Sequence, residues 1–441
     1  MSCSARLTAQ PAPGIGKAMN RRRTTAPKPV HVETLIAESL GARGDAVMDG
    51  PVFTPGLLPG EAAKVEVQGQ RGRVLERLTH SPDRVEPFCP VAERCGGCSL
   101  QHFEESAYRS WKRHLVVDAL HKADVQAEVR TLVDAHGEGR RRLTLHAQRF
   151  GAKLVVGFAE RAGDKIADIT DCPVATPGLR ASIPGLRKLA EVATPKKGRI
   201  DIHALDCQPG LDISVHGVKE ISLNLREAGA ELAGKYNWTR VTIGDDPLIE
   251  FAAPVVKFGD TKVTPSPGGF LQATAEGEAV LAGLVDEAVN SLEGKGPFKA
   301  ADLFAGAGAF ALRLARTMPV LAVEGDSGLL RALQRAAQRT PGLKPVDARV
   351  RDLALEPITP KELEGYSLVV MDPPRAGAKA QAERLSDSMV PVIVSISCNP
   401  STFARDAAIL IEGGYRMGPV TPVDQFKWTG HVESVVVFRR R

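Results

Sequence analysis

The last third of the chain alternates short apolar runs with helix-like segments, and this alternation constrains the fold more than any other feature. Strand-like runs occupy residues 300–304, 320–324, 367–371 and 392–396. Between them lie segments with helical spacing of apolar residues, such as 310–316 and 329–338. Strands that alternate with helices pair in parallel, so the sequence predicts a doubly wound α/β sheet. The run 432–438 is expected to add an antiparallel edge strand.

The rest of the chain shows two other sequence patterns. Residues 29–87 alternate apolar and polar positions in short bursts broken by Gly and Pro, which predicts a small β-barrel. Residues 88–263 mix an amphipathic helix at about 100–123, several strand-like runs and a helical stretch near 186–192, which predicts an α+β domain. We therefore expect four regions: a tail (1–28), the barrel (29–87), the central domain (88–263) and the α/β domain (264–441).

The net charge of +5 comes mainly from the first 28 residues. This segment is rich in Ala, Pro and Arg and contains six of the 57 Lys and Arg residues, so we expect a disordered basic tail, with Met19 as an alternative start. The remaining chain is nearly neutral, and contacts to a nucleic acid must come from local patches such as 71–73 or 140–142. No apolar stretch is long enough to span a membrane, and seven cysteines without a pairing pattern indicate a reducing cytoplasm.

A glycine turn follows the first strand of the α/β domain, in Asp302-Leu303-Phe304-Ala305-Gly306-Ala307-Gly308. Ligands of doubly wound sheets bind beyond the carboxyl ends of the strands, where glycine allows close approach to the backbone. Glu324 ends the second strand, where its carboxylate can accept both hydroxyls of a ribose. The third glycine of the dinucleotide fingerprint is missing, which disfavours NAD. Asp352 and Asp372-Pro373-Pro374 follow at later strand ends and suit adenine binding and then a reactive edge.

Cys398, directly after the strand 392–396, is the candidate nucleophile. A thiolate can add to C6 of uracil and make C5 reactive enough to accept a methyl group from a sulfonium donor. A carboxylate must then remove the C5 proton, and Glu433 is the best candidate for this base. Arg375 can stabilise the enolate oxygen or the thiolate. Taken alone, Cys398 would more often be a core residue and Glu433 a solvated charge, but the glycine turn and Asp372 favour a catalytic site.

A second group of cysteines indicates a metal centre. Cys89, Cys95 and Cys98 cluster among glycines, and Cys172 in Asp171-Cys172-Pro173 can complete a set of four thiolates. Zinc and iron–sulfur clusters both accept such a set. Because zinc ligands more often form two close pairs, we favour a [4Fe–4S] cluster.

These segments resemble the RNA uracil-C5 methyltransferase family, in particular its iron–sulfur type with an N-terminal TRAM barrel. The resemblance runs from about residue 29 to the C-terminus and is most specific in three segments, Asp372–Gly377, Ser397–Thr402 and Asp424–Glu433. It implies, in order along the chain, a TRAM/OB-like barrel, a central domain that carries an iron–sulfur site and a Rossmann-like class I methyltransferase domain. It further implies Cys398 as nucleophile, Glu433 as base and Cys89, Cys95, Cys98 and Cys172 as cluster ligands. The residues expected at the S-adenosyl-L-methionine site are Gln272, Phe304, Gly306, Glu324, Asp352 and Asp372.

The family resemblance implies 5-methyluridine formation in 23S rRNA by a cytoplasmic protein, which we expect to be a monomer. The same chemistry on tRNA stays open. Another enzyme class, the cytosine-C5 methyltransferases, uses cysteine at other positions. Amino methyltransferases follow Asp-Pro-Pro with an aromatic residue, whereas Arg375 stands here. A non-catalytic iron–sulfur RNA-binding protein is the alternative from a different functional class, and the presence of both Cys398 and Glu433 argues against it.

Overall fold

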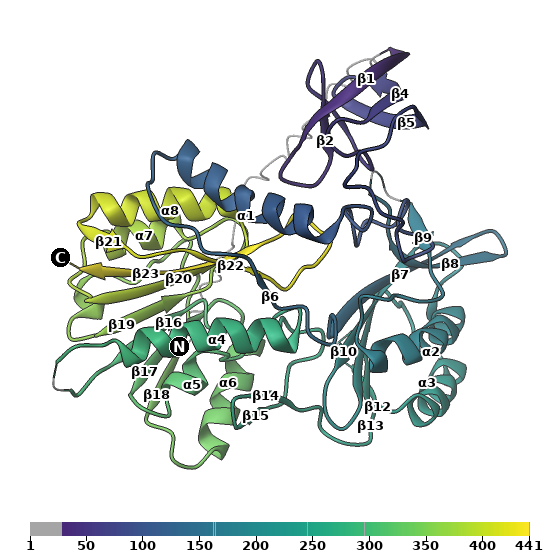
Figure 1. Ribbon diagram of the computed structural model, residues 1–441. Coiled ribbons are helices and arrows are strands. Elements are labelled where there is room, and N and C mark those ends of the chain that lie inside the picture. The colour runs from purple at the N-terminus through teal and green to yellow at the C-terminus, as the bar shows by residue number, and fades with distance from the viewer. Residues whose placement is uncertain (1–28, 162, 164, 245, 295, 441) are drawn as a thin grey trace, which may run out of the picture.

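The computed structural model describes residues 29–161, 163, 165–244, 246–294 and 296–440. The predicted basic tail, including Met19, lies outside these residues. The chain builds a closed barrel, a seven-stranded sheet and a nine-stranded sheet, which follow one another roughly in sequence order (Figure 1). Within the described segments, no helix is long and apolar enough to cross a membrane.

The predicted N-terminal barrel is confirmed, and it closes from five strands in the order β1-β2-β3-β5-β4. Its strands are β1 (Val30–Leu40), β2 (Ala46–Met48), β3 (Val52–Thr54), β4 (Ala62–Gln68) and β5 (Arg71–Arg77). Alternate residues of β4 point inward, so Ala63, Val65 and Val67 are buried in the barrel core. Closure satisfies the backbone groups that an open sheet would leave at its edges.

The middle of the chain forms a seven-stranded sheet in the order β13-β12-β11-β10-β7-β8-β9. Its strands are β7 (Arg142–Phe150), β8 (Lys153–Ala159), β9 (Ile166–Asp168), β10 (Arg199–Asp206), β11 (Leu211–His216), β12 (Trp238–Ile243) and β13 (Asp246–Glu250). Two helices, α2 (Pro177–Ala193) and α3 (Leu223–Lys235), pack on it. The sequence predicts α2 only near 186–192, because Pro184 and Gly185 interrupt the pattern. Burial of Leu179 and Ile183 stabilises the additional turns.

The C-terminal sheet confirms the predicted doubly wound arrangement. Its parallel strands are β18 (Val346–Val350), β17 (Val320–Glu324), β16 (Ala300–Leu303), β19 (Leu368–Met371) and β20 (Val392–Ser397), in that spatial order. One face packs against α4 (Ala275–Asn290), α5 (Ala311–Leu314) and α6 (Ser327–Arg339). The other face packs against α1 (Glu105–Lys122), α7 (Lys379–Ser386) and α8 (Pro400–Glu412) (Figure 1). Strands covered on both faces are rich in apolar residues, and every residue of β20 is buried, including Ser395 and Ser397.

The strand β23 (Glu433–Arg440) is antiparallel to β20, as predicted, but the prediction that it forms the edge is wrong. Both β21 (Tyr415–Met417) and β22 (Thr421–Asp424) pair with its outer side. Beyond β22 lies β6 (Val133–Asp134), a strand from far earlier in the chain. The short elements η1 (Lys361–Leu363) and the hairpin of β14 (Val256–Phe258) and β15 (Thr261–Val263) complete the fold.

Residues 105–134 lie in the stretch predicted to be central domain, but they pack on the C-terminal sheet. The apolar side chains of Val116 and Leu120 on α1 share a core with Phe403 and Leu410 of α8. The physical reason is that the buried apolar residues in the C-terminal half of α1 pack on this sheet, whereas Tyr108 near its start packs with Leu58 and Leu100. The chain therefore crosses from the barrel to the C-terminal sheet before it enters the central sheet.

Candidate active site

A cavity of about 590 Å³ lies at the carboxyl ends of the parallel C-terminal strands. It is lined by all eight residues that the sequence predicts as catalytic or cofactor-binding: Cys398, Glu433, Gln272, Phe304, Gly306, Glu324, Asp352 and Asp372. Most of them stand just after a strand end, where a parallel sheet directs its loops to one side. The fold thus gathers residues that are spread over more than 160 positions of sequence.

The cofactor end of this cavity is built by the glycine turn after β16. Gly306 has φ +55°, and its N–H donates to Glu324 Oε2 at 2.9 Å. Gly308 has φ +96°, and a Cβ there would lie only 2.8 Å from Leu333 Cγ. A side chain at Gly306 would meet nothing within 4 Å, so this glycine leaves open space beside the backbone. The turn therefore has the shape that lets a ligand approach the main chain closely.

Four polar side chains, of which Gln272, Gln425 and Glu433 are buried and Asp372 is half-buried, form a hydrogen-bonded row that ends at Glu433. Gln272 Nε2 donates to Asp372 Oδ2 at 2.8 Å. Gln425 Nε2 donates both to Gln272 Oε1 at 2.7 Å and to Glu433 Oε1 at 3.0 Å. The Gln425 carbonyl oxygen accepts the N–H of Ala273 at 2.9 Å, which fixes the orientation of its amide. Gln425 therefore links the carboxylates of Glu433 and Asp372 through Gln272.

Glu433 is held by one oxygen only. Its Oε1 accepts from Gln425, whereas its buried Oε2 has no hydrogen-bond partner among the described residues. An unpaired buried acceptor is costly in a native structure, which is typical of a group that meets a substrate. Burial, reinforced by the nearby Asp372, raises the pKa of Glu433 well above its usual range, and the Gln425 bond opposes this shift. A carboxyl with a raised pKa is a stronger base once it is ionised.

Cys398 lies at the end of β20, where α8 begins. Asn399 caps that helix by accepting the N–H of Ser401, and Pro400 occupies its first turn. Burial raises the pKa of the Cys398 thiol to about 11, with smaller contributions in the same direction from Glu433 and Asp372. The positive charge of Arg375 opposes that shift. Arg375 lines the same cavity, as the sequence analysis expects for a group that stabilises negative charge there.

The structure adds three residues that the sequence analysis did not assign to the site: Gln425, Phe426 and His431. Phe426 and His431 both line the cavity and meet edge to face, with ring centroids 5.8 Å apart. Burial lowers the pKa of His431 to about 4, so its neutral Nε2 accepts from Arg375 Nη2 at 2.9 Å. A sequence signal existed for Gln425, because it lies in the segment Asp424–Glu433 that carries the family resemblance. Its partners, however, are set by tertiary contacts.

The four predicted metal ligands come together away from this site. Cys89, Cys95, Cys98 and Cys172 line one small cavity of about 50 Å³. Burial raises the pKa of the Cys172 thiol to about 12 and also raises the pKa of Cys95. The described residues contain no group of three or more His, Cys, Asp or Glu side chains placed to hold a metal ion, and these four cysteines are free thiols.

Known proteins resemble this chain over most of its length. Residues 348–441 match the family model described as tRNA (uracil-5-)-methyltransferase. An uncharacterized RNA methyltransferase of Brucella suis is 41% identical over 409 residues, which cover 92% of this chain and 97% of that protein. The 23S rRNA (uracil(1939)-C(5))-methyltransferase RlmD of Chromohalobacter salexigens is 32% identical over 464 residues, covering 96% of this chain and 92% of its own.

A solved structure has the same fold. The tRNA (uracil-54, C5)-methyltransferase of Pyrococcus abyssi, in complex with S-adenosyl-L-homocysteine, superposes with a TM-score of 0.71 at 22% identity. The match covers 92% of this chain and 99% of that one, so it includes the central and C-terminal sheets. Full-length similarity and shared fold agree with the chemistry expected of the cavity. This chain belongs to the family of S-adenosylmethionine-dependent RNA uracil-C5 methyltransferases.

Proposed function

We propose that the protein methylates C5 of a uridine in 23S rRNA through a covalent adduct between Cys398 and C6 of the base. The observation that carries this proposal is the joint position of Cys398 and Glu433 in one cavity with the glycine turn. The 32% identical relative that is named for 23S rRNA supports the choice of RNA. The barrel supports it as well, since a small barrel can grip an RNA backbone while the target base is flipped out.

S-adenosylmethionine, when bound, supplies the methyl group from its sulfonium. We assign its site to Gln272, Phe304, Gly306, Glu324, Asp352 and Asp372. The open backbone at Gly306 and the Glu324 carboxylate suit the nucleoside part. Gln272 and Asp372 lie towards Glu433 and suit the end of the molecule that carries the reactive methyl.

The Cys398 thiolate adds to C6 of uracil, and the electron pair of the C5–C6 double bond moves to C5 and its neighbouring carbonyl. Arg375 stabilises the negative charge on the thiolate and on that enolate oxygen. C5 then forms a bond to the methyl carbon, and the methyl–sulfur bond breaks with its electron pair remaining on sulfur, so that the donor leaves as the neutral thioether S-adenosylhomocysteine. The ionised Glu433 removes the remaining proton from C5, the double bond reforms and the bond between Cys398 and C6 breaks. The free Oε2 of Glu433 is the atom suited to accept this proton.

We propose that Cys89, Cys95, Cys98 and Cys172 hold a [4Fe–4S] cluster. Their shared cavity supports this, and so does the Gly97 N–H, which lies 3.4 Å from Cys95 Sγ in the way that backbone donors solvate cluster sulfurs. When bound, the cluster would join the segment after the barrel to the loop before α2. No step of the methyl transfer depends on it.

We also propose that the regions 29–87, 88–263 and 264–441 serve as RNA-gripping TRAM barrel, cluster-bearing domain and methyltransferase domain. The protein would act as a cytoplasmic monomer, since one chain supplies every residue of the proposed site. A second candidate substrate is tRNA, which is favoured by the description of the matched family model and by the name of the Pyrococcus abyssi enzyme.

The test is a methylation assay with labelled S-adenosylmethionine on unmodified 23S rRNA and, separately, unmodified tRNA. Digestion and mass spectrometry identify the labelled nucleoside. We expect 5-methyluridine from 23S rRNA, and no turnover by Cys398→Ala although it still binds S-adenosylmethionine. Label only in tRNA would overturn the substrate, label in 5-methylcytidine would overturn the base, and an active Cys398→Ala would overturn the covalent mechanism.

A further inference from the structure

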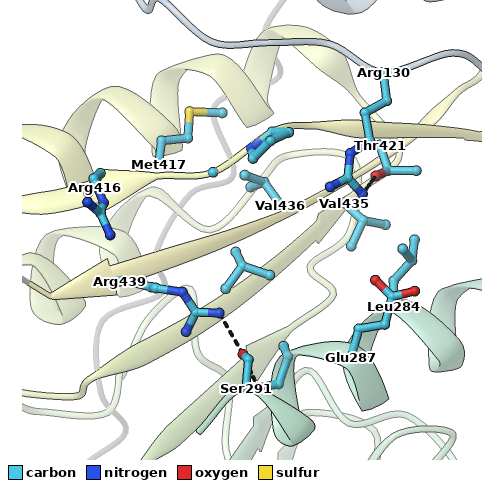
Figure 2. Close-up of a pocket in the computed structure, with 14 residues that line it drawn as sticks. Arg130, Leu284, Glu287, Ser291, Arg416, Met417, Thr421, Val435, Val436 and Arg439 are labelled. Carbon is cyan, nitrogen blue, oxygen red and sulfur yellow. Dashed lines mark hydrogen bonds between the residues drawn. The ribbon is translucent and has the colours of Figure 1, made fainter. Parts of the chain in front are cut away.

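A second cavity, of about 460 Å³, lies between the C-terminal half of α4 and the strands β21–β23 (Figure 2). None of the residues of the proposed active site lines it. Its walls include the apolar side chains of Leu284, Met417 and Val435. We call this cavity the arginine groove, because Arg130, Arg416 and Arg439 also line it.

The three arginines of the groove are not neutralised. Among the described residues, none of them forms an ion pair with a carboxylate, and Glu287 is the single acidic residue in the lining. Arg439 Nη2 donates to Ser291 Oγ at 2.6 Å, and Arg130 Nη1 donates to Thr421 Oγ1 at 3.5 Å (Figure 2). Each of these guanidiniums keeps other N–H groups for a ligand, since arginine has five donors.

The neighbouring Arg440 differs from the three arginines of the groove, because its guanidinium is bonded within the protein. Arg440 donates to the carbonyl oxygens of Ser386 and Gly413 and stacks on the ring of Tyr415, so it is used by the fold itself. Arg416 is exposed, and its guanidinium makes no hydrogen bond within the described segments, although its backbone belongs to β21. The groove thus combines two arginines held by hydroxyl groups with one that is free, which is an arrangement suited to several phosphate groups rather than to one small anion.

The strand β23 borders both cavities, because Glu433 lines the active site and Arg439 lines the arginine groove. Side chains alternate along a strand, so Glu433, Val435, Val437 and Arg439 lie on the same face of the sheet. Six residues separate Glu433 from Arg439, which corresponds to roughly 20 Å along an extended strand. An extended polyanion that delivers one base to Glu433 could therefore reach the arginines with nucleotides a short distance away in sequence.

We propose that the arginine groove binds the sugar–phosphate backbone of the RNA substrate outside the target uridine. This proposal rests on the proposed function, because it takes the same RNA as the ligand. The guanidiniums neutralise phosphates without reading sequence, and the apolar walls pack against ribose. The groove would thereby fix the RNA on the enzyme while the active site handles the flipped base.

The test measures RNA binding as a function of salt. Wild-type protein and the double variant Arg416→Gln, Arg439→Gln are titrated with an unmodified 23S rRNA transcript between about 50 and 200 mM salt, a range over which binding through phosphate contacts weakens strongly. We expect the variant to bind on the order of tenfold more weakly, and the slope of log K against log salt to become shallower by about 2, one for each lost phosphate contact. The single variant Arg416→Gln, which gives up no internal hydrogen bond, should show about half of the change in slope.

Matched controls separate this effect from a general loss of charge or fold. Arg335→Gln, Arg339→Gln removes two exposed arginines from α6, which packs at the opposite edge of the sheet, and should leave the slope unchanged. Glu287→Gln removes the acidic residue of the groove and should tighten binding. Calorimetry with S-adenosylmethionine should give wild-type affinity for every variant.

An unchanged affinity and slope in the Arg416→Gln, Arg439→Gln variant would overturn the proposal and would mean that the groove serves another ligand, such as an acidic protein segment. A loss that the α6 variant matches would overturn it as well. Failure of the proposed function would look different, because the wild-type protein itself would then neither methylate the transcript nor bind it.

Discussion

Gln425 fixes the orientation of Glu433: its amide nitrogen lies 3.0 Å from Glu433 Oε1, while the same nitrogen lies 2.7 Å from Gln272 Oε1. Both hydrogens of the Gln425 amide are used by these two acceptors, and its oxygen is used by the N–H of Ala273. Oε1 of Glu433, the proposed base, is therefore fixed by Gln425, and only Oε2 remains for a substrate.

Replacing Gln425 by Leu should move the activity to higher pH. The Gln425 hydrogen bond lowers the pKa of Glu433, so its loss raises this pKa further above about 8. Hydrogen bonds to charged groups contribute about 1.5–3 kcal/mol, which corresponds to a shift of roughly one to two pH units in the rising limb of single-turnover rate against pH. Gln381→Leu is the matched control, because Gln381 is equally buried but bonds Ile358 far from the cavity. An identical pH profile for both variants would contradict the role of Gln425.

Glu433→Gln should stop the reaction after methyl transfer. Without an ionised carboxylate the C5 proton stays in place, so the bond between Cys398 and C6 cannot break. We expect a protein–RNA complex that survives denaturing electrophoresis and contains the transferred methyl group. The double variant Cys398→Ala, Glu433→Gln should form none. Rapid turnover by Glu433→Gln without such a complex would show that another group takes the proton.

The same substitution should change how stability depends on pH. Because burial raises the pKa of Glu433 from 4.5 to about 8, the folded protein binds more protons than the unfolded chain between these values. The free energy of unfolding therefore decreases as pH rises through this window. Glu433→Gln removes this loss, so the variant should gain up to a few kcal/mol over the wild type at pH 9 relative to pH 5. Urea unfolding at both pH values measures the difference, and equal differences at the two would contradict it.

Lys112 and Asp424 form a buried ion pair that supports the loop leading to Glu433. Lys112 Nζ lies 2.5 Å from Asp424 Oδ1 and 3.1 Å from the carbonyl oxygen of Phe426. Lys112→Met leaves the Asp424 carboxylate buried without its cation and should cost about 3–5 kcal/mol in unfolding free energy. Lys112→Met with Asp424→Asn should be less destabilised than Lys112→Met alone, because no buried charge remains. A larger loss in the double variant would contradict the ion-pair explanation.

The cavity formed by Cys89, Cys95, Cys98 and Cys172 leads to a prediction about the iron and sulfide content of the protein. The purified wild-type protein should contain about four iron and four sulfide per chain, as a [4Fe–4S] cluster requires. Cys172→Ser should lose this iron and lower the unfolding temperature, because the link to the loop before α2 is gone. Cys207→Ser is the control, since the Cys207 thiol lies elsewhere and donates to the carbonyl oxygen of Gly210. Stoichiometric zinc without iron would refute the cluster.

Much of the fold could be predicted because its signals are local. Four of the five parallel C-terminal strands, β16, β17, β19 and β20, appear in the sequence as short, mainly apolar runs, since strands covered on both faces are rich in apolar residues, whereas β18 at the edge is half polar. The barrel appears as alternating residues between turn formers. The short edge elements β6 and β21 escaped prediction, because two or three residues have no periodicity that separates them from a loop.

The sequence by itself determined which residues stand at the strand ends: Cys398, Glu433 and the turn at Gly306, to which we assign the chemistry, lie at positions that the alternation of strands and helices already marks. Tertiary structure alone decided how these groups are held. Gln425 meets Gln272 across 153 residues of chain and Lys112 meets Asp424 across 312 residues. The arginine groove joins Arg130 to Arg416 and Arg439 in the same way. Such pairs depend on how whole sheets and helices pack, and no local pattern of residues specifies which distant partner each side chain meets.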